Sequence, residues 1–171
     1  MIVLSLIGSL LGAYLIIRLD NSFLMRIIPI LLIIIGIYFL LSPDIGKIEK
    51  KAKISITLYS FTFAFIIGFY DGFFGAGTGS FFLVTLVLFL GFQLTKATAY
   101  ARLMNFISNL GALLLFMLFG SIEYKIGLIM ALGQIIGSLI GSKMVLKHGS
   151  KIVRPFVVIV SFLISLKLLW H

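Results

Sequence analysis

Seven long apolar segments, separated by short polar turns, constrain this chain more than any other feature. They lie at roughly 2–17, 27–42, 54–74, 78–92, 102–120, 126–146 and 152–170. A helix needs about 17–25 apolar residues to cross a bilayer. Of the 171 residues 61% are hydrophobic and 11% are charged, whereas a soluble domain has about a quarter charged residues. The pattern predicts an all-α, multi-pass helical bundle in the cell membrane. The fourth segment is short for a span and predicts a tilted helix, a half-helix or a re-entrant arm.

The net charge of +9 is explained by short basic loops and does not indicate a nucleic-acid partner. The positive charges gather in KIEKKAK (47–53) and KMVLKHGSKIVR (143–154), as the positive-inside rule expects of cytoplasmic loops. Counted over alternate sides of the membrane, the charges place residues 47–53 and 147–151 in the cytoplasm. The sequence has no Cys, and its His and Ser residues form no metal-ligand or nucleophile motif. We therefore expect no cofactor, no metal and no enzyme activity.

An internal repeat divides the sequence. IGSLLGAYLIIRL (7–19) matches IGSLIGSKMVLKH (136–148), and the match extends with one gap from 1–41 to about 130–170. The second copy is preceded by 54–129, whereas the first begins at Met1. This predicts an inverted repeat, with 1–42 as the end of a first repeat, 43–53 as a basic loop and 54–171 as the second repeat. The N-terminal part of the first repeat is then missing. Chance similarity between two glycine-containing helices is the alternative.

GAGTG, at 75–79, interrupts the apolar run with three glycines in five residues. Each glycine costs a helix about 1 kcal/mol relative to alanine. Non-helical backbone survives at membrane depth only where protein buries it or where it lines a cavity. We expect Gly75, Gly77, Thr78 and Gly79 to form a broken hairpin, and the N–H groups of 76–80 to bind an anion at the start of the next helix. Close helix packing is the alternative, and it is the role we assign to two other sets of glycines. These sets are Gly8 with Gly12, and Gly133 with Gly137 and Gly141.

Asp71 is the only acid embedded in an apolar run. An ionised carboxylate in that setting costs at least a few kcal/mol. It would therefore be protonated, be paired with Arg102 or Lys96, or face a water-filled cavity. A gating or proton-linked carboxylate and a cap or turn residue that orders the loop remain equal alternatives.

A second polar cluster lies in TAYARLMNFISNLGALL (98–114). Thr98, Arg102, Asn105 and Asn109 are spaced by 4, 3 and 4, which places them on one face of a helix. This face is too polar for lipid, and its donors suit an oxyanion such as sulfite, a sulfonate or a carboxylate. We predict that the two asparagines contact a substrate, with hydrogen bonding between helices as the alternative. Arg102 fits either substrate binding or snorkelling to the cytoplasmic interface.

Taken together, YDGFFGAGTGSFF, ATAYARLMNFISNLGALLLF and GLIMALGQIIGSLIGS resemble the sulfite exporter TauE/SafE family of multi-pass transporters. The resemblance covers about 1–170, as the C-terminal two-thirds of the family pattern. It implies two repeats and a transporter or exporter of small anions, sulfite or organosulfonate-like. The alternative is a non-transporting, truncated or accessory membrane subunit. Besides the anion and the bilayer, the expected partner is a second copy of the chain or the missing N-terminal half.

Overall fold

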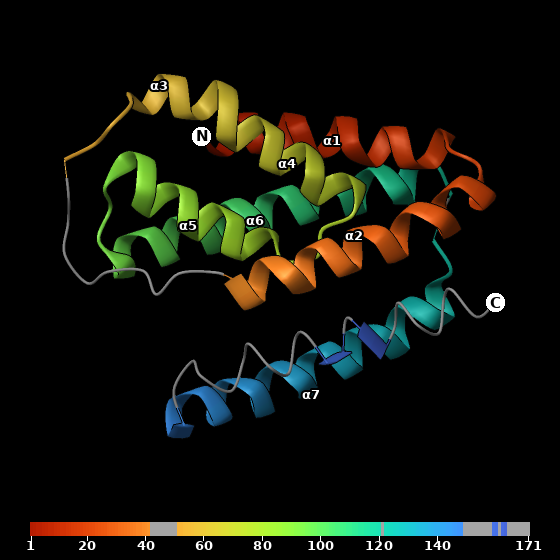
Figure 1. Ribbon diagram of the computed structural model, residues 1–171. Helices are drawn as coiled ribbons and strands as arrows, with labels where there is room; N and C mark the ends of the chain where they lie inside the picture. Colours follow the sequence, from red (N-terminus) through yellow and green to blue (C-terminus); the bar gives the residue numbers. More distant parts are fainter. Residues whose placement is uncertain (42–50, 121, 149–158, 161, 164–171) are drawn as a thin grey trace. The chain divides into compact units, whose positions relative to one another are not determined.

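The computed structural model describes residues 1–41, 51–120, 122–148, 159–160 and 162–163. Within these ranges all regular structure is helical (Figure 1), which confirms the all-α prediction. The elements are α1 (Ile2–Arg18), α2 (Asn21–Leu41), α3 (Ile56–Tyr59), the π-helix η1 (Ser60–Ala64), α4 (Phe65–Phe73), α5 (Thr78–Leu90), α6 (Leu94–Leu118) and α7 (Tyr124–His148). Most of the basic loop at 43–53 and most of the seventh apolar segment lie outside the described residues.

Most helices fall where the apolar segments predict them, but two begin earlier. α2 begins at Asn21 rather than near 27, and α6 begins at Leu94 rather than near 102. The early turns of α6 look polar in sequence, yet Ala97 and Ala101 are buried four residues apart. This spacing gives the segment a core-facing side, so it folds as helix despite its polar residues. α5 has 13 residues, in agreement with a fourth segment too short to span.

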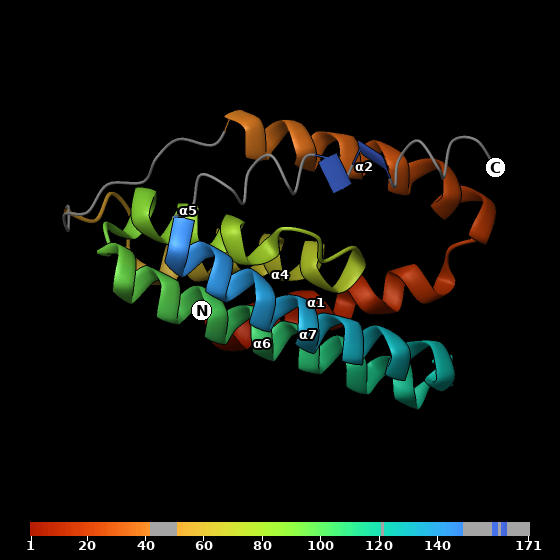
Figure 2. The ribbon, with the colours of Figure 1, turned by 90° about the horizontal axis from the view of Figure 1, so that it is seen from below.

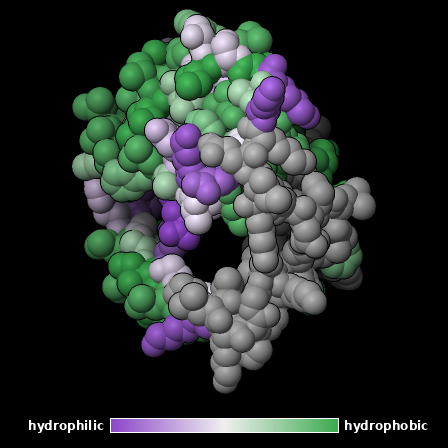
Figure 3. Space-filling model, turned by 90° about the vertical axis from the view of Figure 1, so that its left-hand side faces the viewer, coloured by the Kyte–Doolittle hydropathy of each residue, from purple (hydrophilic) through white to green (hydrophobic). Residues whose placement is uncertain are grey.

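Three helical stretches among the described residues are long and apolar enough to cross a membrane. They are Ile56–Phe73, which runs through α3, η1 and α4, then Leu94–Leu118 and Tyr124–Gly141. The number rises to four if Ile2–Arg18 and Ser22–Leu31 count as one broken span. Large apolar side chains such as Phe106 and Leu118 are exposed, and Figure 3 shows hydrophobic residues over much of the coloured surface, with hydrophilic residues gathered toward the middle of the view. An apolar exterior of this extent is what a lipid-embedded protein presents.

The chain divides into two compact units. One comprises 1–19 with 43–120, and the other comprises 20–42 with 121–171. The first unit contains every element from α1 to α6 except α2. α1 packs in this unit against α4 and α6, although the internal repeat assigns α1 to a different half from these helices. The repeat boundaries themselves stay a prediction.

The core of the first unit lies between the α3–α4 run, α5 and α6. Tyr59, Phe82, Leu86 and Met104 are among the largest side chains fully buried there. The Tyr59 hydroxyl lies 2.9 Å from Thr85 Oγ1, which ties α3 to α5. α5 lies along the N-terminal part of α6 in both ribbon views (Figures 1 and 2). This arrangement sets the start of α5 above the polar face of α6.

α1 and α4 meet through glycines spaced by four residues on each helix. A β-carbon added to Gly68 of α4 would lie 2.6 Å from the Ser5 Cα of α1, and one at Gly12 would lie 2.8 Å from the Phe73 backbone nitrogen. Both distances are well inside van der Waals contact, so the backbones touch directly. The packing role predicted for Gly8 and Gly12 is confirmed. No described atom lies within 4 Å of a β-carbon added to the α7 glycines, so their packing role stays a prediction.

Candidate functional site

The helical path breaks between α4 and α5, as the glycine stretch predicts. α4 ends at Phe73 and α5 begins at Thr78. Gly75 (φ 78°) and Gly77 (φ 80°) both have left-handed backbone, a conformation that side chains disfavour. Two side chains fix the turn: the Tyr70 hydroxyl donates to the Ala76 carbonyl (2.8 Å) and the Thr78 hydroxyl donates to the Gly75 carbonyl (2.9 Å). The broken hairpin is therefore an ordered feature of this unit.

The first turn of α5 presents unpaired backbone donors. The N–H groups of Thr78 and Gly79 have no hydrogen-bond acceptor among the described residues, as is usual at a helix N-terminus. The prediction that the whole stretch 76–80 has free N–H groups is wrong for Ser80. Its N–H donates to the Gly77 carbonyl at 2.9 Å, because Gly77 is the residue that opens the helix. Of the predicted stretch, the N–H groups of residues 76–79 have no acceptor among the described residues, and two of them, those of Thr78 and Gly79, belong to α5.

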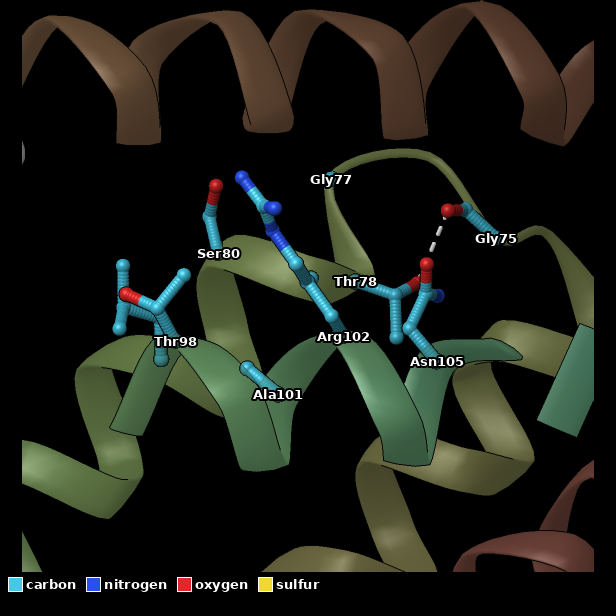
Figure 4. Close-up of a pocket in the computed structure, with 10 residues that line it drawn as sticks. Gly75, Gly77, Thr78, Ser80, Thr98, Ala101, Arg102 and Asn105 are labelled. Carbon is cyan, nitrogen blue, oxygen red and sulfur yellow. Dashed lines mark hydrogen bonds between the residues drawn. The ribbon is translucent and has the colours of Figure 1, made fainter. Parts of the chain in front are cut away.

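A cavity of about 390 Å³ lies between this turn and α6, and we call it the Arg102 cavity. Its lining comprises Gly75, Gly77, Thr78, Gly79, Ser80, Leu83, Thr98, Ala101, Arg102 and Asn105. Figure 4 shows the Arg102 side chain rising from α6 into the space between Ser80 and the Gly77 turn. Arg102 is the only charged residue of this set, and Leu83 is its only large apolar one. The cavity is thus small, polar and positively charged.

Beside this cavity, Asp71 is held by donors from α6. The residue as a whole is only 6% exposed. Asn105 Nδ2 donates to Oδ1 (3.2 Å) and to Oδ2 (3.1 Å). Asn109 Nδ2 donates to Oδ2 at 3.1 Å, and the Ser108 hydroxyl donates to the same oxygen. The sequence suggests Arg102 or Lys96 as the partner of the Asp71 carboxylate, whereas the hydrogen bonds in the structure come from these amides and this hydroxyl. Asp71 is not a helix cap, because it lies inside α4 and the residue that caps α5 is Gly77; a role in ordering the turn stays a prediction.

A second cavity, also of about 390 Å³, borders the Asp71 cluster and is lined by Asp71 and Asn109 but not by Asn105, and we call it the Asn109 cavity. Its lining comprises Ile16, Asp71, Gly72, Phe73, Phe74, Gly75, Asn109, Ala112, Leu113 and Phe116. Asp71 is the only charged residue of this set, and most of the others are aliphatic or aromatic. Gly75 lines both cavities. The structure therefore separates the two predicted asparagines: Asn105 faces the first cavity and Asn109 the second.

Sequence reasoning misses one member of the cluster, Ser108. This residue is fully buried, and its backbone carbonyl also accepts a hydrogen bond of 2.6 Å from the Ser9 hydroxyl of α1. Its position next to Asn109 and three residues after Asn105 is the only signal in the sequence. No group of three or more His, Asp or Glu side chains suited to a metal ion occurs in the described part of the chain. Substrate binding by the predicted residues stays a prediction.

Comparison with known proteins identifies the relatives of this chain. The family model described as Sulfite exporter TauE/SafE matches residues 1–168. A "Probable membrane transporter protein" of Haemophilus influenzae is 43% identical over 164 residues, which are 96% of this chain and 64% of that protein. The "Probable membrane transporter protein YfcA" of Escherichia coli K12 is 44% identical over 173 residues, with 99% and 63% covered. No solved structure matches.

A third relative, the "Probable membrane transporter protein ORF9" of a Sinorhizobium species, is 41% identical over 169 residues, with 99% of this chain and 65% of that protein covered. The chain therefore spans a little under two-thirds of the length of these relatives. The family match and the relatives cover nearly the whole chain, and its apolar helices agree with their description. The chain is a multi-pass membrane protein that belongs to the sulfite exporter TauE/SafE family.

Proposed function

We propose that this protein moves small oxyanions across the cell membrane and that the Arg102 cavity is where they bind. The class of activity follows from kinship: the relatives are named as membrane transporters, and the family description names a sulfite exporter. These names favour a transporter over an enzyme. Sulfite and related organosulfonates are accordingly the first substrates to test.

The observation that carries this proposal is the convergence of anion-binding groups in one cavity. Arg102 contributes a guanidinium, whose parallel donors match the oxygens of a sulfonate or carboxylate. Thr78 and Gly79 contribute unpaired N–H groups at the N-terminus of α5, where the helix dipole favours negative charge. Asn105 lies on the same wall. No carboxylate belongs to the ten lining residues, so nothing among them repels an anion.

The size and polarity of the lining favour a compact, hydrophilic substrate. A volume of about 390 Å³ is at the small end of ligand pockets, which run from about 300 to 1,000 Å³. A long alkyl tail would find only Leu83 as a large apolar neighbour. Inorganic oxyanions and short-chain sulfonates or carboxylates therefore fit the lining better than fatty or aromatic acids.

Anion flux into liposomes that contain the purified protein tests the proposal. The panel is sulfite, sulfoacetate, taurine and acetate, and we expect uptake of sulfite or of the short sulfonates. Arg102→Gln should abolish uptake. Arg18→Gln is the matched control, because Arg18 hydrogen-bonds Tyr14 (2.9 Å) and lines neither cavity. Absence of flux for every anion would favour the non-transporting alternative, and equal flux in both variants would remove Arg102 from the substrate site.

A further inference from the structure

We propose that the Asn109 cavity is a second station for the same anion, and that Asp71 with its α6 partners separates it from the Arg102 cavity. This inference rests on the proposed function. It assigns a role to a cavity whose lining is mostly apolar. The anion would then occupy two successive sites along its transport path.

The two cavities lie one after the other along a single face of α6. Thr98, Arg102 and Asn105 line the first, and Asn109, Leu113 and Phe116 line the second. Successive members of this set are four, three, four, four and three residues apart, which is the spacing of one helical face. From Thr98 to Phe116 the helix rises about 27 Å at 1.5 Å per residue. This nearly matches the hydrocarbon thickness of a bilayer, about 30 Å.

Asp71 forms the partition between the stations. Asn105, which lines the first cavity, donates its side-chain N–H groups to both Asp71 oxygens. Asn109, which lines the second cavity, donates to Oδ2 and also to the Asn105 carbonyl at 2.7 Å. An anion that moves from the first cavity toward the second must compete with the Asp71 carboxylate for these amide donors. Passage is therefore coupled to release of Asp71 from α6.

Gly75 leaves the partition thin. It lines both cavities, and a β-carbon there would lie 3.1 Å from the Asp71 carbonyl oxygen and 3.4 Å from Oδ1. A side chain at this position would crowd the Asp71 carbonyl oxygen and would also be strained by the left-handed backbone (φ 78°). With glycine, no side chain is added at Gly75 to the partition that Asp71 and its α6 partners form.

The charges of the two stations differ in sign. The only charged lining residue is Arg102 in the first cavity and Asp71 in the second. An anion is therefore held more tightly beside Arg102 and more weakly beside Asp71. A path conducts only if binding is favourable enough for entry and weak enough for exit. The Asn109 cavity, with Asp71 in its lining, would bind the anion weakly enough for exit.

Cysteine modification tests the inference cleanly, because the natural sequence contains no Cys. Thr98→Cys reports on the first cavity and Leu113→Cys on the second. Leu114→Cys is the matched control, because Leu114 is 53% exposed on α6 and lines neither cavity. Each variant in liposomes is treated with sulfonatoethyl methanethiosulfonate, which is small, anionic and thiol-reactive. Sulfite flux is then compared with the flux of the same variant before treatment, and mass spectrometry measures the extent of modification.

We expect modification of Thr98→Cys and of Leu113→Cys to stop sulfite flux, while modified Leu114→Cys keeps its flux. The membrane-impermeant reagent should reach the two cavity positions from opposite sides of the bilayer. The ratio of the modification rate by the cationic trimethylammonioethyl reagent to that by the anionic reagent should be higher at Leu113→Cys than at Thr98→Cys. The added change Asp71→Asn should remove this difference in the ratio. If Leu113→Cys does not accumulate in the membrane, Phe116→Cys serves in its place.

Two results would overturn the inference and leave the proposed function standing. One is blocked flux at Thr98→Cys together with unchanged flux in fully modified Leu113→Cys. The other is a Leu113→Cys thiol that the reagent reaches from neither side. Unchanged flux after full modification of Thr98→Cys would instead count against the proposed function, and this inference would fall with it.

Discussion

Replacement of Gly68 by alanine tests the contact that positions α4, and with it the turn that lines both cavities. The new β-carbon would lie 2.6 Å from the Ser5 Cα and 2.8 Å from the Ser5 carbonyl carbon. Non-bonded carbon atoms pack at about 3.5–4.0 Å, so α1 and α4 must separate by about 1 Å. Both neighbours are backbone atoms, so rotation of a side chain cannot relieve the contact.

The energetic cost can be worked out from three terms. Overpacking of this kind costs about 1–3 kcal/mol. Displacement of α1 also strains the 2.6 Å hydrogen bond from Ser9 to the Ser108 carbonyl, and such a bond is worth about 1 kcal/mol. Alanine stabilises the helix by about 1 kcal/mol relative to glycine, because its helix propensity is higher. We therefore expect Gly68→Ala to lower the free energy of unfolding by about 1–3 kcal/mol.

The assay is a melting curve of detergent-solubilised protein, read by size-exclusion chromatography after heating. For a chain of this size, 1 kcal/mol corresponds to about 2–4 °C in Tm, so Gly68→Ala should melt several degrees lower. Gly137→Ala makes the same chemical change on α7, where no described atom lies within 4 Å of the added carbon, and it should melt at or slightly above the wild-type temperature. The reasoning is refuted if Gly68→Ala melts no lower than Gly137→Ala.

Three further predictions address the site and the topology. Gly77→Leu should insert normally but lose sulfite uptake, because Gly77 is left-handed (φ 80°) and lines the Arg102 cavity; normal uptake would exclude Gly77 from the path. Asn105→Leu should raise the half-saturation concentration for sulfite about tenfold to a hundredfold, since a hydrogen bond to a charged group is worth about 1.5–3 kcal/mol. A lower Tm with an unchanged binding titration would return Asn105 to helix packing. Cysteines at Glu49 and Ser150 should react with an impermeant label only after permeabilisation, and reaction in intact cells would contradict the predicted cytoplasmic loops.

Local features of the site are predictable from the sequence because they depend only on nearby residues. Helical periodicity alone places Thr98, Arg102 and Asn105 on one face, whatever packs against them. The break at Gly75 and Gly77 likewise follows from the backbone freedom of glycine. These two features account for most of the Arg102 cavity, although not for its volume.

The partners of Asp71 could not be predicted, because they depend on how α4 crosses α6. A buried carboxylate suggests a charged partner when the sequence is read alone, and Arg102 and Lys96, both on the next long polar segment, are the candidates that the sequence offers. The structure satisfies the carboxylate with amides and a hydroxyl instead. Ser108 escapes notice for a related reason: a serine in a membrane helix commonly bonds to its own backbone, and its second partner appears only once the helices are packed.

The hydrogen bond from Ser9 to Ser108 joins residues 99 positions apart, and this separation has a consequence for biosynthesis. At about 5–20 residues per second, the ribosome supplies the α6 partner roughly 5–20 s after the α1 donor. α4, which packs against Gly8 and Gly12, is made earlier, but until α6 follows the Ser9 hydroxyl lacks its Ser108 acceptor. In the nascent chain α1 can therefore pair with α4 for seconds before α6 completes its contacts.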